Sequence, residues 1–365
     1  MNSPAVLLLT NTPTPYRLPV FAELAKHVDL TVLYCESKQP DRFWQIDLSH
    51  TPIAHAYLPS RALRLPGITL TVNPDFARRL GHLHFDIAIA GENFTHFPAV
   101  ITLNQVAQRR KKPFALWSGS IDTAYASGNL LSNLYRRWLY GRTKAFLTYG
   151  AAASQFLQRR GVPADRIVTS RQVVPAEQIA LPAQSREELG LANKQVVLYV
   201  GYLNSRKGVP TLLQAFQQVA QENDRLVLVG DGPEKAALQQ MAAGDERIQF
   251  PGYLEGAKKS SWYAASDLFV LPTRHDPWGL VVNEAMSFGL PIITTEAAGC
   301  AELIQENGFI VPVDDVNAMA AALNELLKDP TKRRQMGQLS LEYIAPYTVD
   351  AACEAFLQLI QQALK

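Results

Sequence analysis

Short runs of apolar residues alternate along the chain with segments whose apolar positions repeat at the spacing of an amphipathic helix. The first run, AVLLLT (5–10), precedes the helical pattern LPVFAELAKH (18–27). The second half repeats this arrangement with QVVLYVG (195–201) and VPTLLQAFQQVAQEN (209–223). Continuous Val, Ile and Leu runs are typical of strands covered on both faces, as in parallel sheets. Their alternation with helices predicts α/β doubly wound domains.

Further segments of both kinds follow in each half. The expected strands are 29–35, 85–91, 113–117, 144–150, 225–233, 247–253, 267–273 and 290–296. The expected helices are 98–110, 135–143, 153–161, 234–244 and 280–289. A polar stretch with two prolines marks a boundary near 175–195. The pattern therefore predicts an N-terminal domain (1–180), a C-terminal domain (181–345) and a final helix (346–365).

The composition is that of a globular protein with sizeable cores. Of the 365 residues, 47% are apolar and 19% are charged, which excludes disordered, collagen-like and low-complexity classes. The formal net charge of +2 argues against a dedicated nucleic-acid binder. The cysteines are expected to be reduced thiols because they are odd in number and far apart: Cys35, Cys300 and Cys353.

The sequence shows neither an export signal nor a membrane span. The apolar run Ala5–Leu9 is short and has no basic residue before it, which fits a buried strand better than a signal peptide. No window approaches the roughly 18 apolar residues that a membrane helix needs. We therefore expect a cytoplasmic protein, and a peripheral contact with the cytoplasmic membrane face stays open.

The most informative stretch is LPTRHDPWGLVVNEAM (271–286), which has the pattern of a strand, a loop and a helix. Gly279 permits close approach of the backbone to a bound group, and the amides of Gly279 and Leu280 are free donors at the helix N-terminus. Such a terminus favours phosphate. Two acids, Asp276 and Glu284, flank the turn. Acids and glycines also occur at ordinary helix starts, but the whole stretch after a buried strand favours a ligand site.

Two more strand–loop–helix clusters precede that stretch. In VGYLNSRKGVPTLLQAF (200–216), Lys207 stands just before a helix, where it would neutralise a diphosphate as a point charge. A solvated basic turn is the alternative. In LVLVGDGPEKAAL (226–238), two glycines close a strand, which is weak evidence alone because tight turns use the same residues. The sequence contains neither a dinucleotide fingerprint after a strand nor a P-loop.

Taken in this order, the clusters resemble the retaining GT-B-fold glycosyltransferases of the large family (family 4 type, group 1) that includes sucrose synthase and bacterial mannosyltransferases. The hallmark of that family is two acids eight residues apart around a Phe-Gly-Leu turn, here DPWGLVVNE (276–284). IQFPGY (248–253), SDLFVLPT (266–273) and the continuation over 285–315 match neighbouring family blocks. The resemblance is specific over 195–345 and loose in the N-terminal half.

The resemblance implies two Rossmann-like domains that face each other across a cleft, with the last helix crossing back onto the N-terminal domain. The N-terminal domain would bind the acceptor and the C-terminal domain the nucleotide sugar. The implied reaction is metal-independent, retaining hexosyl transfer from a UDP- or GDP-sugar to a glycan or glycolipid hydroxyl, in bacterial cell-surface synthesis. No metal, permanently bound cofactor or nucleic-acid partner is expected.

The resemblance also implies roles for single residues. Glu284 would hydrogen-bond the ribose, Asp276 would hold hydroxyls of the donor sugar, and Lys207 would stabilise the leaving diphosphate. The other residues that it places at the donor are Arg206, Gly252, Tyr253, Leu254, Trp278, Gly279 and Leu280.

Three positions depart from the family pattern. Asp276 is one methylene shorter than the usual Glu, so the sugar contact is shifted or the sugar differs. Tyr202 stands where the family usually has an Arg, and either Arg206 or Arg17 could supply the missing cation. The first loop, 12–17, lacks the frequent Gly-Gly pair.

The acceptor side is less readable. A dedicated base is dispensable if the leaving phosphate accepts the acceptor's proton. If a base exists, Asp122 and His96 are the candidates, with structural roles as the alternative. The basic segments 108–112 and 136–137 could meet an anionic membrane surface or form solvated helix faces.

The sequence is also compatible with other activities. A nucleotide-sugar epimerase would need no acceptor, and a phosphorylase-like enzyme would carry a lysine-bound pyridoxal phosphate. A non-catalytic nucleotide-sugar-binding protein is the alternative from a different class.

Overall fold

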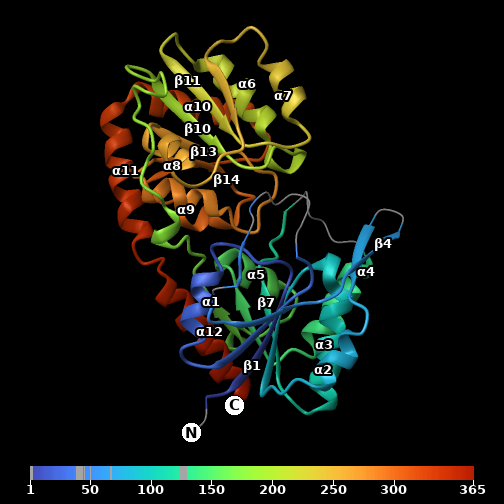
Figure 1. The fold of residues 1–365 in the computed structure, drawn as a ribbon. Helices are drawn as coiled ribbons and strands as arrows, with labels where there is room; N and C mark the ends of the chain where they lie inside the picture. The colour runs from blue at the N-terminus through green and yellow to red at the C-terminus, as the bar shows by residue number, and fades with distance from the viewer. Residues whose placement is uncertain (1–2, 38–43, 45, 50, 66–67, 124–129) are drawn as a thin grey trace. The chain divides into compact units, whose positions relative to one another are not determined.

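The computed structural model describes residues 3–37, 44, 46–49, 51–65, 68–123 and 130–365, which form two compact units (Figure 1). Unit 1 contains the described residues of 1–121 and 128–172 together with 348–365. Unit 2 contains those of 122–127 and 173–347. The chain therefore leaves unit 1 after Gln172 and returns to it at Thr348.

A parallel sheet forms the centre of unit 1. In the described part of the chain it has seven strands in the order β3-β2-β1-β6-β7-β8-β9. They are β1 (Ala5–Thr10), β2 (Asp29–Tyr34), β3 (Ala54–Tyr57), β6 (Ile87–Gly91), β7 (Phe114–Ser118), β8 (Ala145–Thr148) and β9 (Ile167–Thr169). β1 pairs with both β2 and β6, so the direction of strand addition reverses there. A separate antiparallel pair consists of β4 (Arg61–Leu65) and β5 (Ile68–Val72).

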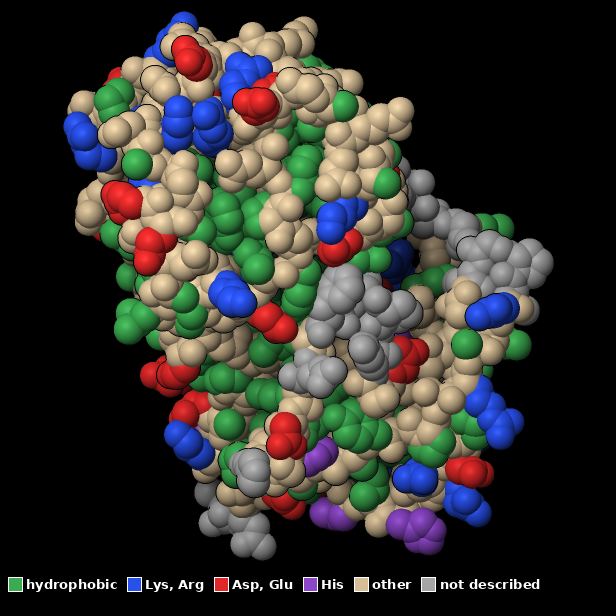
Figure 2. Space-filling view, turned by 45° about the horizontal axis from the view of Figure 1, so that its top comes forward, with side chains coloured by type: hydrophobic (Ala, Val, Ile, Leu, Met, Phe, Trp, Pro, Cys, Tyr) green, Lys and Arg blue, Asp and Glu red, His purple; other side chains and the backbone are tan. Residues whose placement is uncertain are grey.

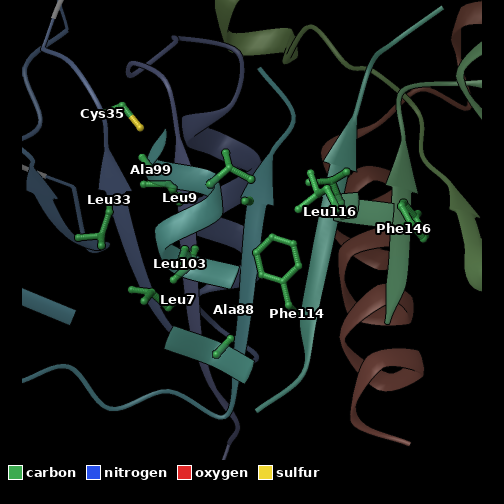
Figure 3. Packing of buried hydrophobic residues seen from close by; sticks show 14 of the residues in the cluster. Leu7, Leu9, Leu33, Cys35, Ala88, Ala99, Leu103, Phe114, Leu116 and Phe146 are labelled. Atoms are coloured by element: carbon green, nitrogen blue, oxygen red, sulfur yellow. The ribbon is translucent and has the colours of Figure 1, made fainter. Parts of the chain in front are cut away.

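Helices cover both faces of this sheet. They are α1 (Leu18–Leu24), α2 (Phe76–Gly81), α3 (Phe97–Arg109), α4 (Leu130–Tyr140), α5 (Ala151–Arg159) and α12 (Val349–Leu364), with the short 3-10 helices η1 (Phe94–His96) and η3 (Ala164–Arg166). Figure 3 shows Ala99 and Leu103 of α3 among the strand residues Leu7, Leu9 and Ala88, all of them buried in one apolar cluster.

The last helix of the chain packs on the opposite face of the unit 1 sheet. α12 lies against α1 and the strands β7 and β8 (Figure 1). Phe356 of α12 places its ring 5.1 Å from that of Trp117 and 6.1 Å from that of Phe21, measured between centroids. Aromatic contacts thus join residues far apart in the sequence.

Unit 2 is built around a second parallel sheet. Its described residues form six strands in the order β12-β11-β10-β13-β14-β15. They are β10 (Gln195–Val200), β11 (Asp224–Val229), β12 (Ile248–Gly252), β13 (Leu268–Leu271), β14 (Ile292–Thr295) and β15 (Gly308–Val311). The direction of strand addition reverses at β10, which pairs with both β11 and β13. In open α/β sheets, ligands bind outside the carboxyl ends of the strands at such a point.

Helices follow the strands of unit 2, one after most strands and two after β15. They are α6 (Val209–Val219), α7 (Lys235–Met241), α8 (Gly256–Ala264), α9 (Leu280–Ser287), α10 (Val316–Lys328) and α11 (Pro330–Ile344), with the 3-10 helices η4 (Ala176–Gln178), η5 (Ser205–Lys207) and η6 (Gly299–Leu303). The prediction of two doubly wound α/β domains is confirmed.

Within the described ranges no helix is long and apolar enough to cross a membrane. No group of three or more His, Cys, Asp or Glu among those residues is arranged to hold a metal ion. On the face shown in Figure 2, basic and acidic side chains lie interspersed among neutral ones.

Candidate functional site

Two loops at the carboxyl ends of β10 and β13 are tied together by backbone and side-chain hydrogen bonds. The carbonyl oxygen of Arg206 accepts from the amide of Arg274 at 2.8 Å and from Oγ1 of Thr273 at 3.1 Å. The guanidinium of Arg274 donates in turn to the carbonyl oxygen of Ser205 at 2.9 Å. Because β10 and β13 are neighbours in the sheet, these contacts hold η5 beside the loop that leads into α9.

An ion pair between Lys207 and Asp276 lies at this junction. Nζ of Lys207 donates to Oδ2 of Asp276 at 2.5 Å, and only 10% and 13% of the two side chains are exposed. Oδ1 of Asp276 accepts from the amide of Trp278 at 3.2 Å. Burial by itself would raise the pKa of Asp276, but the positive charges of Lys207 and Arg206 outweigh it and lower that pKa to about 2. The carboxylate is therefore ionised at neutral pH.

Arg206 brings a further positive charge to the site. Its guanidinium donates to the carbonyl oxygen of His275 at 3.2 Å, and among the described residues no carboxylate pairs with it. Burial and the charge of Arg206 lower the pKa of His275, so that the imidazole is neutral near pH 7. Lys207 and Arg206 both act on the single carboxylate of Asp276, which leaves a net positive charge at these loops.

The N-terminus of α9 lies beside Asp276. Gly279 precedes the helix with a φ of 98°, a left-handed conformation that favours glycine. A Cβ atom at this position would lie 2.8 Å from Cδ2 of Leu271 and 3.1 Å from Sγ of Cys300. The first amides of a helix have no acceptor within it, and the helix dipole is positive there. The arrangement of this terminus, Lys207 and Arg206 is therefore suited to an anionic group.

Glu284 lies on α9, with both carboxylate oxygens already hydrogen-bonded. Nζ of Lys259 donates to Oε1 at 2.7 Å, and the hydroxyl of Tyr263 donates to Oε2 at 2.8 Å. Burial, and then the charge of Glu284, raise the pKa of Tyr263 well above its ordinary range, so the hydroxyl stays a donor. Sequence reasoning missed Lys259 and Tyr263. Their four-residue spacing marks one face of a helix, but nothing in it points to Glu284.

Trp278 is buried beneath the loop. Only 3% of the residue is exposed, and its indole Nε1 donates to Oδ1 of Asn283 at 2.9 Å. The ring lies 6.3 Å from that of Tyr347 between centroids. The side chain is therefore engaged in packing, and what Trp278 presents at the site is its backbone.

The three residues expected near the base lie at the end of β12. Gly252 has a φ of 85°, and its carbonyl oxygen accepts from the amide of Gly230 at 2.9 Å. Tyr253 is 37% exposed, and burial together with the charge of Glu255 raises its pKa to about 12. Leu254 is half-buried. These residues share the carboxyl edge of the sheet with Lys207 but come from its outermost strand.

Arg17 lies in unit 1 and is firmly held. Its guanidinium is 4.3 Å from the ring centre of Trp117 and donates to the hydroxyl of Tyr149 at 2.6 Å and to Oγ1 of Thr10 at 3.1 Å. Of the two residues that could supply the missing family cation, Arg206 belongs to the loops that carry Lys207 and Asp276.

His96 is buried in unit 1 and pairs with an acid. Its Nε2 lies 3.3 Å from Oε1 of Glu36, and its Nδ1 lies 2.9 Å from Oγ1 of Thr95. Glu36 also accepts a hydrogen bond from Thr71. The hydrogen bond from His96 lowers the pKa of Glu36, although burial opposes this.

Asp122, the other candidate base, is exposed and groups with unit 2. Its neighbour Thr123 lies with Oγ1 2.9 Å from Nδ1 of His275, the residue before Asp276. Sequence position alone would place Asp122 in the N-terminal domain. The contact of Thr123 instead relates this segment to the loop that leads into α9.

A buried charge network in unit 1 was not predicted from the sequence. Oε1 of Glu92 accepts from Nε of Arg136 at 2.9 Å and from the hydroxyl of Tyr140 at 3.0 Å, while Oε2 accepts from Ser118. Only 3% of the Glu92 side chain is exposed. Of the basic pair 136–137, Arg136 therefore points inward and Arg137 is exposed.

The fold of the whole chain is similar to that of solved GT-B proteins. The Anabaena protein HepE (Alr3699), solved in complex with UDP, matches with a TM-score of 0.79 and 18% identity over 98% of this chain and 99% of that one. Two doubly wound parallel sheets with this likeness define the GT-B fold, which confirms the expected fold class.

The similarity to a known protein family lies in unit 2. Residues 194–329 match the family model of glycosyl transferases group 1. Alpha-D-kanosaminyltransferase of Streptomyces kanamyceticus is 28% identical over 55% of each chain, and sulfoquinovosyl transferase SQD2 of Arabidopsis thaliana is 33% identical over 45% of this chain and 32% of that one. The chain thus spans about half or less of the length of these relatives. Residues 194–329 are thus similar to the group 1 glycosyltransferases, the family that the motifs around 276–284 resemble.

Proposed function

We propose that this protein is a retaining glycosyltransferase that moves a sugar from a nucleoside-diphosphate sugar to the hydroxyl of a glycan or glycolipid acceptor. The observation that carries the proposal is the buried pair of Lys207 and Asp276 beside the N-terminus of α9. The family match over 194–329 supports the class of reaction. The complex of HepE with UDP supports a UDP-sugar, with a GDP-sugar as the alternative donor.

The cations of the site would act on the leaving diphosphate. As the bond to the sugar breaks, negative charge grows on the phosphate oxygen while the sugar becomes positively charged. Lys207, Arg206 and the first amides of α9 would stabilise that oxygen without a metal ion. A preorganised donor of this kind is worth about 3–4 kcal/mol of transition-state stabilisation, or a factor of ~10²–10³ in rate.

The acids of the site would hold the donor. Asp276, ionised and oriented by Lys207, accepts hydrogen bonds and would bind sugar hydroxyls. Glu284 has one donor on each oxygen, and an ionised carboxylate accepts about four hydrogen bonds, so capacity is left for a ribose hydroxyl. Gly252, Tyr253 and Leu254 would lie near the base. In the same-face route, the leaving phosphate takes the acceptor's proton, and Asp122, which is exposed, would position the acceptor. His96, which is buried beside Glu36, would have the structural role that is its alternative.

A panel of UDP-, GDP-, ADP- and dTDP-sugars tests the proposal by thermal shift and by hydrolysis of the donor. One of these donors should stabilise the fold by about 2.7 kcal/mol at a hundredfold excess over Kd. Glu284→Ala should abolish the stabilisation by the matching donor and leave the unliganded protein folded. The matched control is Glu325→Ala, an exposed acid on α10. A protein that none of the donors stabilises, or a Glu284→Ala variant with unchanged turnover, would refute the proposal.

The catalytic role of Lys207 needs a paired substitution. Lys207→Met alone leaves Asp276 charged and buried, which destabilises the fold. Lys207→Met/Asp276→Asn removes both charges, and we expect it to fold but to lose about 10²-fold or more in donor turnover. Lys328→Met, at an exposed position on α10, is the control for charge alone. If the enzyme converts a nucleotide sugar into one with a different sugar configuration when no acceptor is added, it is instead an epimerase.

A further inference from the structure

Helix α4 turns an apolar face to the solvent. Leu130 is 74% exposed, Leu131 72% and Leu134 53%. At about 100° per residue these leucines project from the same side of the helix as Arg137 and Trp138. A surface helix of a globular protein ordinarily carries polar residues on that side. The outward face of α4 therefore combines exposed leucines with tryptophan and arginine, where polar and charged residues alone are usual.

The inward face of α4 determines which residues point outward. Leu139 and Tyr140 are buried in the unit 1 core, and the ring of Tyr135 lies 5.3 Å from that of Phe97 on α3. Arg136 is held by Glu92 at 2.9 Å. Because an ion pair and three packed side chains fix one side of the helix, it cannot rotate about its axis to bury the exposed leucines. In Figure 1, α4 accordingly lies on the flank of unit 1 beside α3.

Basic residues accompany the apolar face, and acidic residues are missing from this part of the sequence. Residues 130–164 contain six Lys or Arg, at positions 136, 137, 142, 144, 159 and 160, and no Asp or Glu. Arg137, Arg142 and Lys144 are exposed. The guanidinium of Arg142 lies 4.7 Å from the ring centre of Trp138, next to the apolar face. The segment thus differs from the chain as a whole, whose net charge is only +2.

We propose that the outward face of α4 docks on the surface of an anionic lipid bilayer. Leucines that enter the boundary between headgroups and acyl chains, with Trp and Arg at headgroup level, are typical of interfacial helices. Basic side chains near the surface are attracted to anionic lipids over about a Debye length. A second copy of this chain fits less well, because an isologous contact through α4 would bring the two Arg137 side chains together. This inference goes beyond the proposed reaction and does not depend on it.

Sedimentation of the full chain with lipid vesicles tests the proposal. The protein should bind phosphatidylcholine vesicles that contain about 30 mol% phosphatidylglycerol, bind pure phosphatidylcholine more weakly, and lose affinity as salt rises. Leu130→Ser/Leu131→Ser/Leu134→Ser should weaken binding to the anionic vesicles about tenfold or more. The matched control is Leu181→Ser, because Leu181 of unit 2 is 86% exposed. It should bind as the unaltered protein does.

Two charge-reversal variants separate electrostatic attraction to anionic lipids from insertion of the apolar leucines. Arg137→Glu should weaken binding to the anionic vesicles, and Arg334→Glu, at an exposed position on α11, should not. Thermal melting of every variant controls for folding. Absence of vesicle binding by the unaltered protein, or equal binding by the triple leucine variant, would overturn the proposal. So would a dimer in analytical ultracentrifugation that only the leucine variant dissociates. No nucleotide sugar is needed, so the result is independent of the donor panel.

Discussion

Each of the two sheets has a buried ion pair beside the carboxyl end of one of its strands. Glu92 follows β6 in unit 1 and Lys207 follows the loop after β10 in unit 2, and the two pairs differ in the groups that surround them. In unit 1, Glu92 accepts from Arg136, Tyr140 and Ser118, so both of its oxygens and its charge are matched by the protein. In unit 2, the pair of Lys207 and Asp276 is accompanied by the guanidinium of Arg206, so that two cations face one carboxylate. The comparison shows that burial of a charge pair is not by itself a sign of a ligand site.

The two networks differ in the net charge that remains once the ion pair has formed. In the network of Glu92, the carboxylate is paired with Arg136 and accepts three hydrogen bonds, and the network fixes the orientation of α4 against the sheet. A network with an excess positive charge next to the N-terminus of α9 is suited to an anion. The ion pair of unit 1 therefore stabilises the fold, whereas the ion pair of unit 2, as we propose, belongs to a diphosphate-binding site.

The largest effect is expected when the ion pair of unit 1 is broken. Arg136→Met leaves the Glu92 carboxylate buried without its counter-charge and should destabilise the fold by about 3–5 kcal/mol. Arg137→Met, at the adjacent exposed position, should change stability by less than about 0.5 kcal/mol. Urea unfolding near neutral pH measures both. Similar losses for the two variants would show that the network around Glu92 does not anchor α4.

A glycine substitution tests the loop that presents Lys207. Gly208 has a φ of 63°, and a Cβ atom there would lie 2.1 Å from the carbonyl oxygen of Pro272. Gly208→Ala should therefore destabilise the fold by up to about 3 kcal/mol. Gly81→Ala is the control, because no atom lies within 4 Å of the added Cβ and φ is not positive. Equal unfolding midpoints for the two variants would contradict the tight contact of the loops.

The pH dependence of stability sharpens the comparison further. Asp276 has a folded pKa of about 2 against an ordinary value of 3.8, so its contribution is complete above about pH 4. That contribution is lost as pH falls toward about 2, because the unfolded chain then binds the proton more readily. The shift corresponds to about 2 kcal/mol. Unfolding of the unaltered protein and of Asp276→Asn between about pH 2 and 6 should show a difference that shrinks on acidification. A difference in unfolding free energy that stays constant between about pH 2 and 6 would argue against a lowered pKa of Asp276 in the folded protein.

Most of the strands could be predicted because apolar runs mark them. The first run, 5–10, coincides with β1, and the run 195–201 exceeds β10 by one residue. The edge strand β3, with the sequence AHAY, was missed because its side chains are only partly buried and form no apolar run. β9 was missed as well, because three residues are too short for any periodicity.

The candidate site was predictable where one local segment builds it. Gly279 and the start of α9 follow from the pattern of strand, loop and helix, and the resemblance assigned Lys207 and Asp276. The partners of Glu284 were not predictable, because Lys259 and Tyr263 reach it from a different helix.

The sequence by itself determined the alternation of strands and helices, the turn at Gly279 and the resemblance to the group 1 glycosyltransferases, since each depends on residues close together in the chain. Only the tertiary structure decided which charges meet: Arg136 with Glu92 across 44 residues and Lys207 with Asp276 across 69. Such contacts depend on how the strands are ordered in their sheets, and local spacing carries no record of that order.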